Sequence, residues 1–93
     1  MDSSDMRALA RANSDKKIEA IYAKELDMIY EAAKAGNFFV DIDEVLVQDE
    51  FVDYLIRHGF KVLYYHMYEE IWYECRVASA VNWLSCSKIK VKW

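Results

Sequence analysis

The chain has 93 residues and a net charge of −4, with apolar residues making up 55% of it and aromatic residues 15%. A chain of this length forms one domain, and its apolar content is too high for an intrinsically disordered protein. No run of about 18 apolar residues is present, which excludes a membrane-spanning helix. The two cysteines, Cys75 and Cys86, are too few for a disulfide scaffold, and the polar start of the chain predicts no secretory leader. We therefore expect a cytoplasmic protein with both cysteines as thiols.

Charge is unevenly distributed along the chain. Residues 37–76 contain nine acidic residues against three basic ones, for −6, whereas residues 77–93 contain only Lys88, Lys90 and Lys92, for +3. The acidic middle disfavours direct binding to nucleic acid over most of the surface. It suits a basic partner protein instead.

The first predicted element is a helix over residues 4–35, which is rich in alanine, lysine, glutamate and arginine. Ser3 or Ser4 is its predicted N-cap. Asn13-Ser14-Asp15 interrupts the pattern, and Ser14 offers a second cap there. We therefore expect residues 1–13 to fray, or to become ordered only on a partner.

One face of this helix carries an apolar stripe in its second half. Its members follow a 4-3-4 spacing, which suits a short coiled-coil seam, and they are Tyr22, Leu26, Ile29 and Ala33. The stripe predicts self-association as a homodimer through the N-terminal helix.

Two glycines, Gly36 and Gly59, divide the rest of the chain, because each follows a helical pattern and precedes an apolar, alternating run. We expect both to end helices in the left-handed conformation. A strand over residues 37–43 and a helix over 50–58 lie between them, and residues 60–67 predict a central strand with two apolar faces. The short helix has Asp49 as its predicted cap and, as its buried stripe, Phe51, Val52, Leu55 and Ile56.

The C-terminal third admits two interpretations. Residues 71–77 show the alternation of a strand that pairs back on 60–67, whereas residues 71–84 also keep a helical rhythm; we favour the hairpin and leave the helix open. Residues 88–93 alternate lysine with apolar residues and predict a last edge strand, whose lysines discourage aggregation. The sequence thus predicts an α+β fold of order α-β-α-β-β. A long N-terminal helix and one short helix pack on a three- to four-stranded antiparallel sheet.

Several of these segments together resemble a recurrent type of small tailed-bacteriophage accessory protein. The resemblance lies in a long helix before Gly36-Asn37-Phe38-Phe39-Val40, in residues 55–62 (Leu-Ile-Arg-His-Gly-Phe-Lys-Val), and in Val81-Asn82-Trp83, which stands for that type's final Ile-Ser-Trp strand. It covers residues 18–83. It implies a viral protein that inhibits or redirects a host or defence-system macromolecule in the host cytoplasm, and it implies no catalytic residues. This chain departs from the type in its longer stretch before Trp83 and in its basic tail.

Few residues point to catalysis or metal binding. No phosphate-binding loop, dinucleotide fingerprint or nucleophile elbow is present. Asp41 and Asp43 share one face of their predicted strand, but the further ligands and turn glycine of a calcium site do not follow, which favours a solvated face. His58 and His66 do not form the tight ligand pairs with the cysteines that structural zinc sites use. We expect no cofactor, no metal and no enzymatic activity.

The density of aromatic residues between positions 64 and 73 is the most informative feature. Tyrosine and tryptophan dominate interface hot spots, and strand alternation turns some of them outward, beside acidic neighbours. The predicted partner contacts are Tyr65, Tyr68, Glu69, Glu70 and Trp72. The leading hypothesis is binding to a host protein or protein complex, and the alternatives are a self-associating assembly protein and an acidic nucleic-acid mimic. The three lysines with Trp93 offer charge and stacking to nucleic acid, but edge protection explains them as well.

Overall fold

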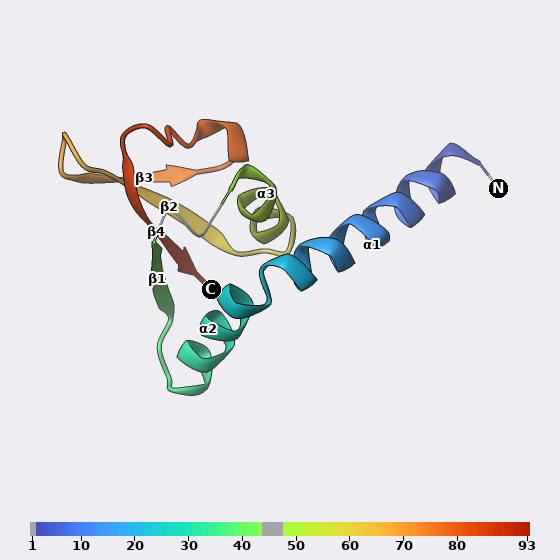
Figure 1. Ribbon diagram of the computed structural model, residues 1–93, viewed down its shortest axis with the longest axis horizontal. Helices are drawn as coiled ribbons and strands as arrows, with labels where there is room; N and C mark the ends of the chain where they lie inside the picture. Colours follow the sequence, from blue (N-terminus) through green and yellow to red (C-terminus); the bar gives the residue numbers. More distant parts are fainter. Residues whose placement is uncertain (1, 44–47) are drawn as a thin grey trace.

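A computed structural model describes residues 2–43 and 48–93 of the chain (Figure 1). Within these ranges the elements are, in chain order, α1 (Ser3–Ile21), α2 (Ala23–Lys34), β1 (Phe39–Asp43), α3 (Asp49–Arg57), β2 (Lys61–His66), β3 (Ile71–Cys75), the 3₁₀-helix η2 (Ala78–Ala80) and β4 (Cys86–Lys92). The strands form one antiparallel sheet in the order β1-β4-β2-β3. The predicted α+β class is confirmed. None of the described helices has the length and apolar character needed to cross a bilayer.

The start of α1 differs from the prediction. Asp2, and not Ser3 or Ser4, is the N-cap, because its carboxylate accepts a hydrogen bond from the Asp5 N–H at 3.0 Å. The Asp5 carboxylate in turn accepts from the Asp2 N–H at 3.4 Å, which completes a capping box.

The predicted interruption at Asn13-Ser14-Asp15 is wrong, because α1 runs unbroken through it. Asp15 accepts hydrogen bonds from the side chains of Arg57, at 3.0 Å, and His58, at 3.1 Å. Its carboxylate is therefore occupied by a tertiary contact and does not compete for backbone N–H groups, which is how aspartate usually disturbs a helix.

The helical region breaks later, at Tyr22, which ends α1 with φ −104° and ψ 26° and precedes α2. The Tyr22 ring stacks on Phe51 of α3 with centroids 4.4 Å apart, and its hydroxyl donates to Glu50 at 3.2 Å. The break thus coincides with tight packing against α3, at a place where the sequence has no glycine or proline.

Most of α1 projects away from the body of the protein (Figure 1). Residues 3–14 are exposed, including Met6 at 56% and Leu9 at 53%, and contacts with the body begin at Asp15. About a dozen residues without tertiary packing form only a marginal helix in water. The expectation that residues 1–13 fray or become ordered on a partner remains a prediction.

Both glycines end helices as predicted. Gly36 and Gly59 have φ of +90° and +88°. After α2, Asn37 N–H bonds to the Ala32 carbonyl; after α3, Phe60 N–H bonds to the Leu55 carbonyl, each at 3.0 Å. These bonds, with the shorter ones from the glycines themselves, form two Schellman motifs that satisfy the last carbonyls of each helix.

The position of β4 corrects the prediction most strongly. The sequence predicted an edge strand over residues 88–93, but β4 lies inside the sheet, between β1 and β2. Lys88 pairs with Asp43 on one side and with Tyr65 on the other, and Lys90 pairs with Asp41 and Leu63. The edges of the sheet are β1 and β3, so the β4 lysines do not protect an edge.

The predicted hairpin is confirmed, since β2 and β3 pair with Tyr65 opposite Trp72. The strand ends at Cys75, and the helical alternative for residues 71–84 is realised only in η2. Val81-Asn82-Trp83 forms no strand, and the last strand of the described chain is β4, followed by Trp93. The Trp83 indole N–H donates to the Asp49 carboxylate instead.

The helices pack on one face of the sheet and leave the other face open (Figure 1). From α3, Phe51, Val52 and Leu55 are fully buried as predicted, Ile56 is half-buried, and Tyr54 is buried although the predicted stripe left it out. The cap of α3 is Gln48, with no side-chain bond, so the cap predicted at Asp49 is wrong. Inward residues of the sheet that complete the core are Ile42, Val62, Tyr64, Cys75, Ile89 and Val91.

The left-handed conformation of Gly59 leads to a stability prediction. A Cβ added there meets no atom within 4 Å, so Gly59→Ala introduces backbone strain and no clash. We expect it to lower the free energy of unfolding by about 1 kcal/mol in urea denaturation. Gly59→Asn should lower it less, because asparagine tolerates positive φ. Equal losses for both variants, or none for alanine, would contradict the Schellman assignment.

Candidate binding surfaces

The face of the sheet that none of the described helices covers is built by strand alternation. On β2 and β4, Val62, Ile89 and Val91 are buried toward the helices, so their neighbours point to the opposite side. This open face consists of Phe39, Asp41 and Asp43 from β1, Lys88, Lys90 and Lys92 from β4, Lys61, Leu63 and Tyr65 from β2, and Trp72 and Glu74 from β3.

Aromatic rings and ammonium groups interleave on the open face. The rings of Tyr65 and Trp72 meet edge to face across β2 and β3, with centroids 5.2 Å apart. The Lys90 ammonium lies 4.4 Å from the Trp72 centroid and 4.7 Å from that of Phe39. The Lys88 ammonium lies 5.3 Å from Tyr65 and 5.5 Å from Trp72. Each such cation–π contact is worth roughly 0.5–1 kcal/mol at an exposed site. The contacts therefore favour these lysine conformations but are weak enough for the side chains to move.

The β2–β3 turn carries the other predicted contacts, and the side chains of Tyr68 and Glu69 lie against His66 and Tyr73, whose side chains point to the helix side of the sheet. Tyr68 is 76% exposed, and both glutamates, Glu69 and Glu70, are exposed. Glu69 is tied down, because its N–H donates to His66 Nδ1 at 3.1 Å and its carboxylate accepts from the Tyr73 hydroxyl. That hydrogen bond raises the pKa of Tyr73. Glu70 adopts φ 58°, the left-handed conformation that reverses the chain.

The predicted contact set is therefore divided between two neighbouring places. Tyr65 and Trp72 lie on the open face, and Tyr68, Glu69 and Glu70 lie at the turn. Sequence reasoning missed Phe39 and Leu63, which join the face from β1 and β2. Their outward direction follows from alternation, but their neighbourhood depends on the strand order.

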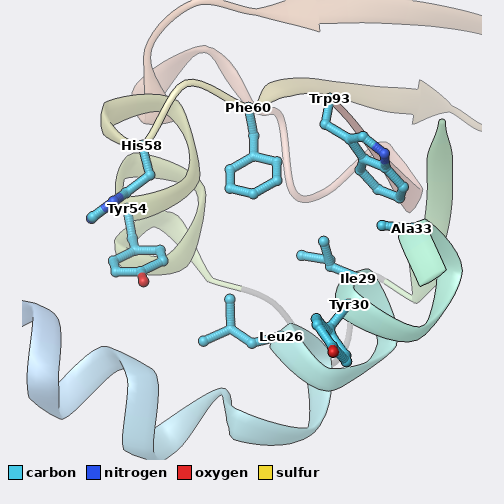
Figure 2. Close-up of a pocket in the computed structure, with 8 residues that line it drawn as sticks. All are labelled: Leu26, Ile29, Tyr30, Ala33, Tyr54, His58, Phe60 and Trp93. Atoms are coloured by element: carbon cyan, nitrogen blue, oxygen red, sulfur yellow. The ribbon is translucent and has the colours of Figure 1, made fainter.

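On the helix side, a pocket of about 490 Å³ opens between α2 and α3. Figure 2 shows the residues around it, which come from both helices, from the position just before β2 and from the end of the chain. Its lining is Leu26, Ile29, Tyr30, Ala33, Tyr54, His58, Phe60 and Trp93. Trp93 thus lies on the opposite side of the sheet from the lysines, so the predicted grouping of Trp93 with Lys88, Lys90 and Lys92 is wrong.

Two polar groups at this pocket are already engaged. The Tyr54 hydroxyl donates to Glu19 at 2.9 Å, and burial followed by this bond raises the pKa of Tyr54 to about 12. His58 Nε2 meets Asp15, whose pKa is lowered mainly by its hydrogen bond with Arg57. The pocket therefore offers aromatic and aliphatic contact more than acid–base chemistry.

The residues of the predicted dimer seam have other neighbours. Tyr22 and Ile29 are buried in the core of the chain itself, Leu26 is partly buried, and Leu26 and Ala33 border the pocket. The four residues therefore do not form an exposed stripe in the folded monomer. Self-association through the helix remains a prediction for which Leu26 and Ala33 are the accessible members.

The candidate metal ligands are spread over the molecule. Asp41 and Asp43 share the open face as predicted, opposite Lys90 and Lys88. His58 lies at the end of α3, whereas Cys75 and Cys86 are buried in the sheet. Across residues 2–43 and 48–93, no three histidine, cysteine, aspartate or glutamate side chains gather as a metal site would require.

No protein-family model matches the chain, and comparison with curated proteins and with solved structures finds no similar protein. The resemblance to phage accessory proteins stays a prediction.

The burial of the cysteines leads to a prediction about reactivity. Cys75 is 3% exposed, and burial raises the pKa of its thiol to about 11. At pH 8, only about one such thiol in a thousand is ionised, and the thiolate is the reactive form. We expect iodoacetamide to label Cys75 slowly in the native protein and rapidly in urea, whereas a Ser79→Cys variant, exposed at position 79, should react rapidly in both. Equal native rates at positions 75 and 79 would contradict the structure.

Proposed function

We propose that this chain works as a non-catalytic binding protein, and that the open face with the adjoining β2–β3 turn contacts a partner protein. The observation that carries the proposal is the position of Phe39, Tyr65 and Trp72, whose rings lie on a face that no described helix covers. Tryptophan and tyrosine contribute most to protein interfaces when they are central and surrounded by polar groups. The open face has this arrangement, with lysines among the rings and acids at both sides.

The chemistry of the two surfaces favours the open face over the pocket. The pocket lies on the helix side and is lined almost entirely by apolar groups. The open face spans all four strands and combines rings, cations and carboxylates, which is the mixed composition of transient protein interfaces. A surface spread over several strands suits a macromolecule, whereas small ligands usually bind in concave sites.

For the partner's identity, we propose a host or defence-system protein, on the basis of the sequence resemblance to small tailed-phage proteins. A nucleic-acid mimic is a weaker candidate, because mimicry needs a continuous acidic surface and the open face has four lysines. An assembly protein that self-associates would use the accessible part of α2, away from the open face.

The proposal predicts that one pair of substitutions strongly weakens partner capture. The full chain, immobilised, is incubated with bacterial lysate, and retained proteins are identified by mass spectrometry. We expect Tyr65→Ala with Trp72→Ala to weaken binding of the retained partner by about thirtyfold or more, since hot-spot truncations cost at least about 2 kcal/mol. Circular dichroism verifies that the variant is folded.

Tyr30→Ala provides the matched control, because Tyr30 is 62% exposed but lies at the pocket. It should retain the partner at the level of the unsubstituted chain. A partner that survives the double substitution at the open face, or that depends on Tyr30 instead, would overturn the proposal. Capture of no specific protein by any form of the chain would also count against it.

A further inference from the structure

The lysines of β4 form a straight row along the middle of the open face. Lys88, Lys90 and Lys92 occupy alternate positions of one strand, so successive stems are about 6.8 Å apart. Their spacing matches that of alternate side chains in any other extended chain. A strand laid along β4 with acidic side chains at every second residue would therefore place one carboxylate near each lysine.

These ammonium groups are not neutralised within the described chain. Asp41 and Asp43 lie opposite Lys90 and Lys88 in register, yet the ion pairs in residues 2–43 and 48–93 all involve Arg57 or His58. Lys88 and Lys90 lean over the rings of β2, β3 and β1 instead. These ring contacts restrict the two lysine side chains in the free protein. The side chains therefore lose less conformational entropy when a partner binds.

One end of the row contains an unfavourable pair. Lys92 lies directly opposite Lys61 of β2, and like charges at facing positions destabilise a sheet. Phe39, the other neighbour of Lys92, carries no charge to compensate. An anionic group bound between the two ammonium groups would screen this repulsion. An acidic partner would therefore stabilise this end of the sheet.

The charge distribution limits how wide an anionic partner surface can be. The open face carries four lysines and three acids, for +1, whereas the whole chain carries −4 and its remainder therefore −5. Asp41 and Asp43 border the row on the β1 side, and Glu74 lies at the β3 side. Carboxylates on both sides repel a broad anionic surface, so an anion fits only along the narrow central row.

We infer that the open face binds an extended acidic segment of a partner protein, aligned with β4, whose carboxylates contact Lys61, Lys88, Lys90 and Lys92. This inference rests on the proposed function and specifies the chemistry of its partner. The acidic middle of the sequence suits a basic partner by composition alone, but the sheet order brings the lysines to the centre and moves the acids to the border. Single-stranded nucleic acid fits less well, because it is charged at every residue beyond the lysine row as well as along it, and the −5 of the remaining surface opposes those outlying phosphates.

Fluorescence anisotropy with three labelled probes tests the inference on the full chain. The probes are a peptide in which glutamate alternates with threonine, the same peptide with glutamine for glutamate, and an oligothymidine. We expect the glutamate peptide alone to bind at low salt and to dissociate as salt is added. The substitutions Lys61→Gln with Lys92→Gln should weaken its binding about tenfold, at the scale of two exposed charge contacts.

The same double variant should unfold at a higher urea concentration than the unsubstituted chain, because it removes a like-charge pair. A variant that is more stable but binds more weakly cannot be explained by general damage to the protein. Lys16→Gln with Lys17→Gln on α1 is the matched control, since it removes the same charge from exposed positions away from the sheet and should leave binding unchanged within about twofold.

Binding of the oligothymidine in place of the glutamate peptide would overturn the inference in favour of nucleic acid. Binding of the glutamate peptide that is insensitive to Lys61→Gln with Lys92→Gln would overturn the assignment to β4, and failure of that peptide to bind would overturn the inference outright. If the peptide fails while capture of a protein still depends on Tyr65 and Trp72, only the acidic segment is excluded and the proposed function stands. If both fail, neither stands.

Discussion

The rest of the structure depends on the insertion of β4 between β1 and β2. This strand joins β1 to the β2–β3 hairpin, so the sheet is continuous only when β4 is in place. Ile89 and Val91 are fully buried beneath the helices, and they anchor the strand in the core. The same alternation that buries these residues turns the three lysines toward solvent. A single strand thus completes the hydrophobic core and supplies the cations of the open face.

The two sides of the sheet differ in composition and in what covers them. On the helix side, α2 and α3 cover the core, the rings of Tyr22 and Phe51 stack where the helices meet, and α1 extends outward from that junction. On the open side, rings and ammonium groups support one another while remaining accessible. Charged side chains lie among the apolar ones on this side and divide the exposed apolar area.

Features that depend on a few neighbouring residues could be predicted from the sequence. The glycine-ended helices, the short helix and the β2–β3 hairpin are local, and alternation correctly separated Tyr65 and Trp72 from the core. Strand order could not be predicted, because β4 pairs with β1 residues some 50 positions away in the sequence. Alternating lysines are also equally compatible with an edge strand and with a central strand that has one face exposed to solvent. The break at Tyr22 likewise depends on packing against α3 and leaves no local signal. Trp93 was misplaced although its side was predictable locally, because alternation puts position 93 on the face of Ile89 and Val91, opposite the lysines.

Amide hydrogen exchange measured by NMR across β4 tests the central position of this strand most directly. In an interior antiparallel strand every amide bonds to one neighbour or the other, so consecutive amides from Lys88 to Val91 should all exchange slowly. In an edge strand, alternate amides face solvent and exchange rapidly. Uniform protection over these residues is the result that the structure predicts. An alternating pattern of fast and slow amides would contradict it, and the lysine row would then border the sheet instead of crossing its open face.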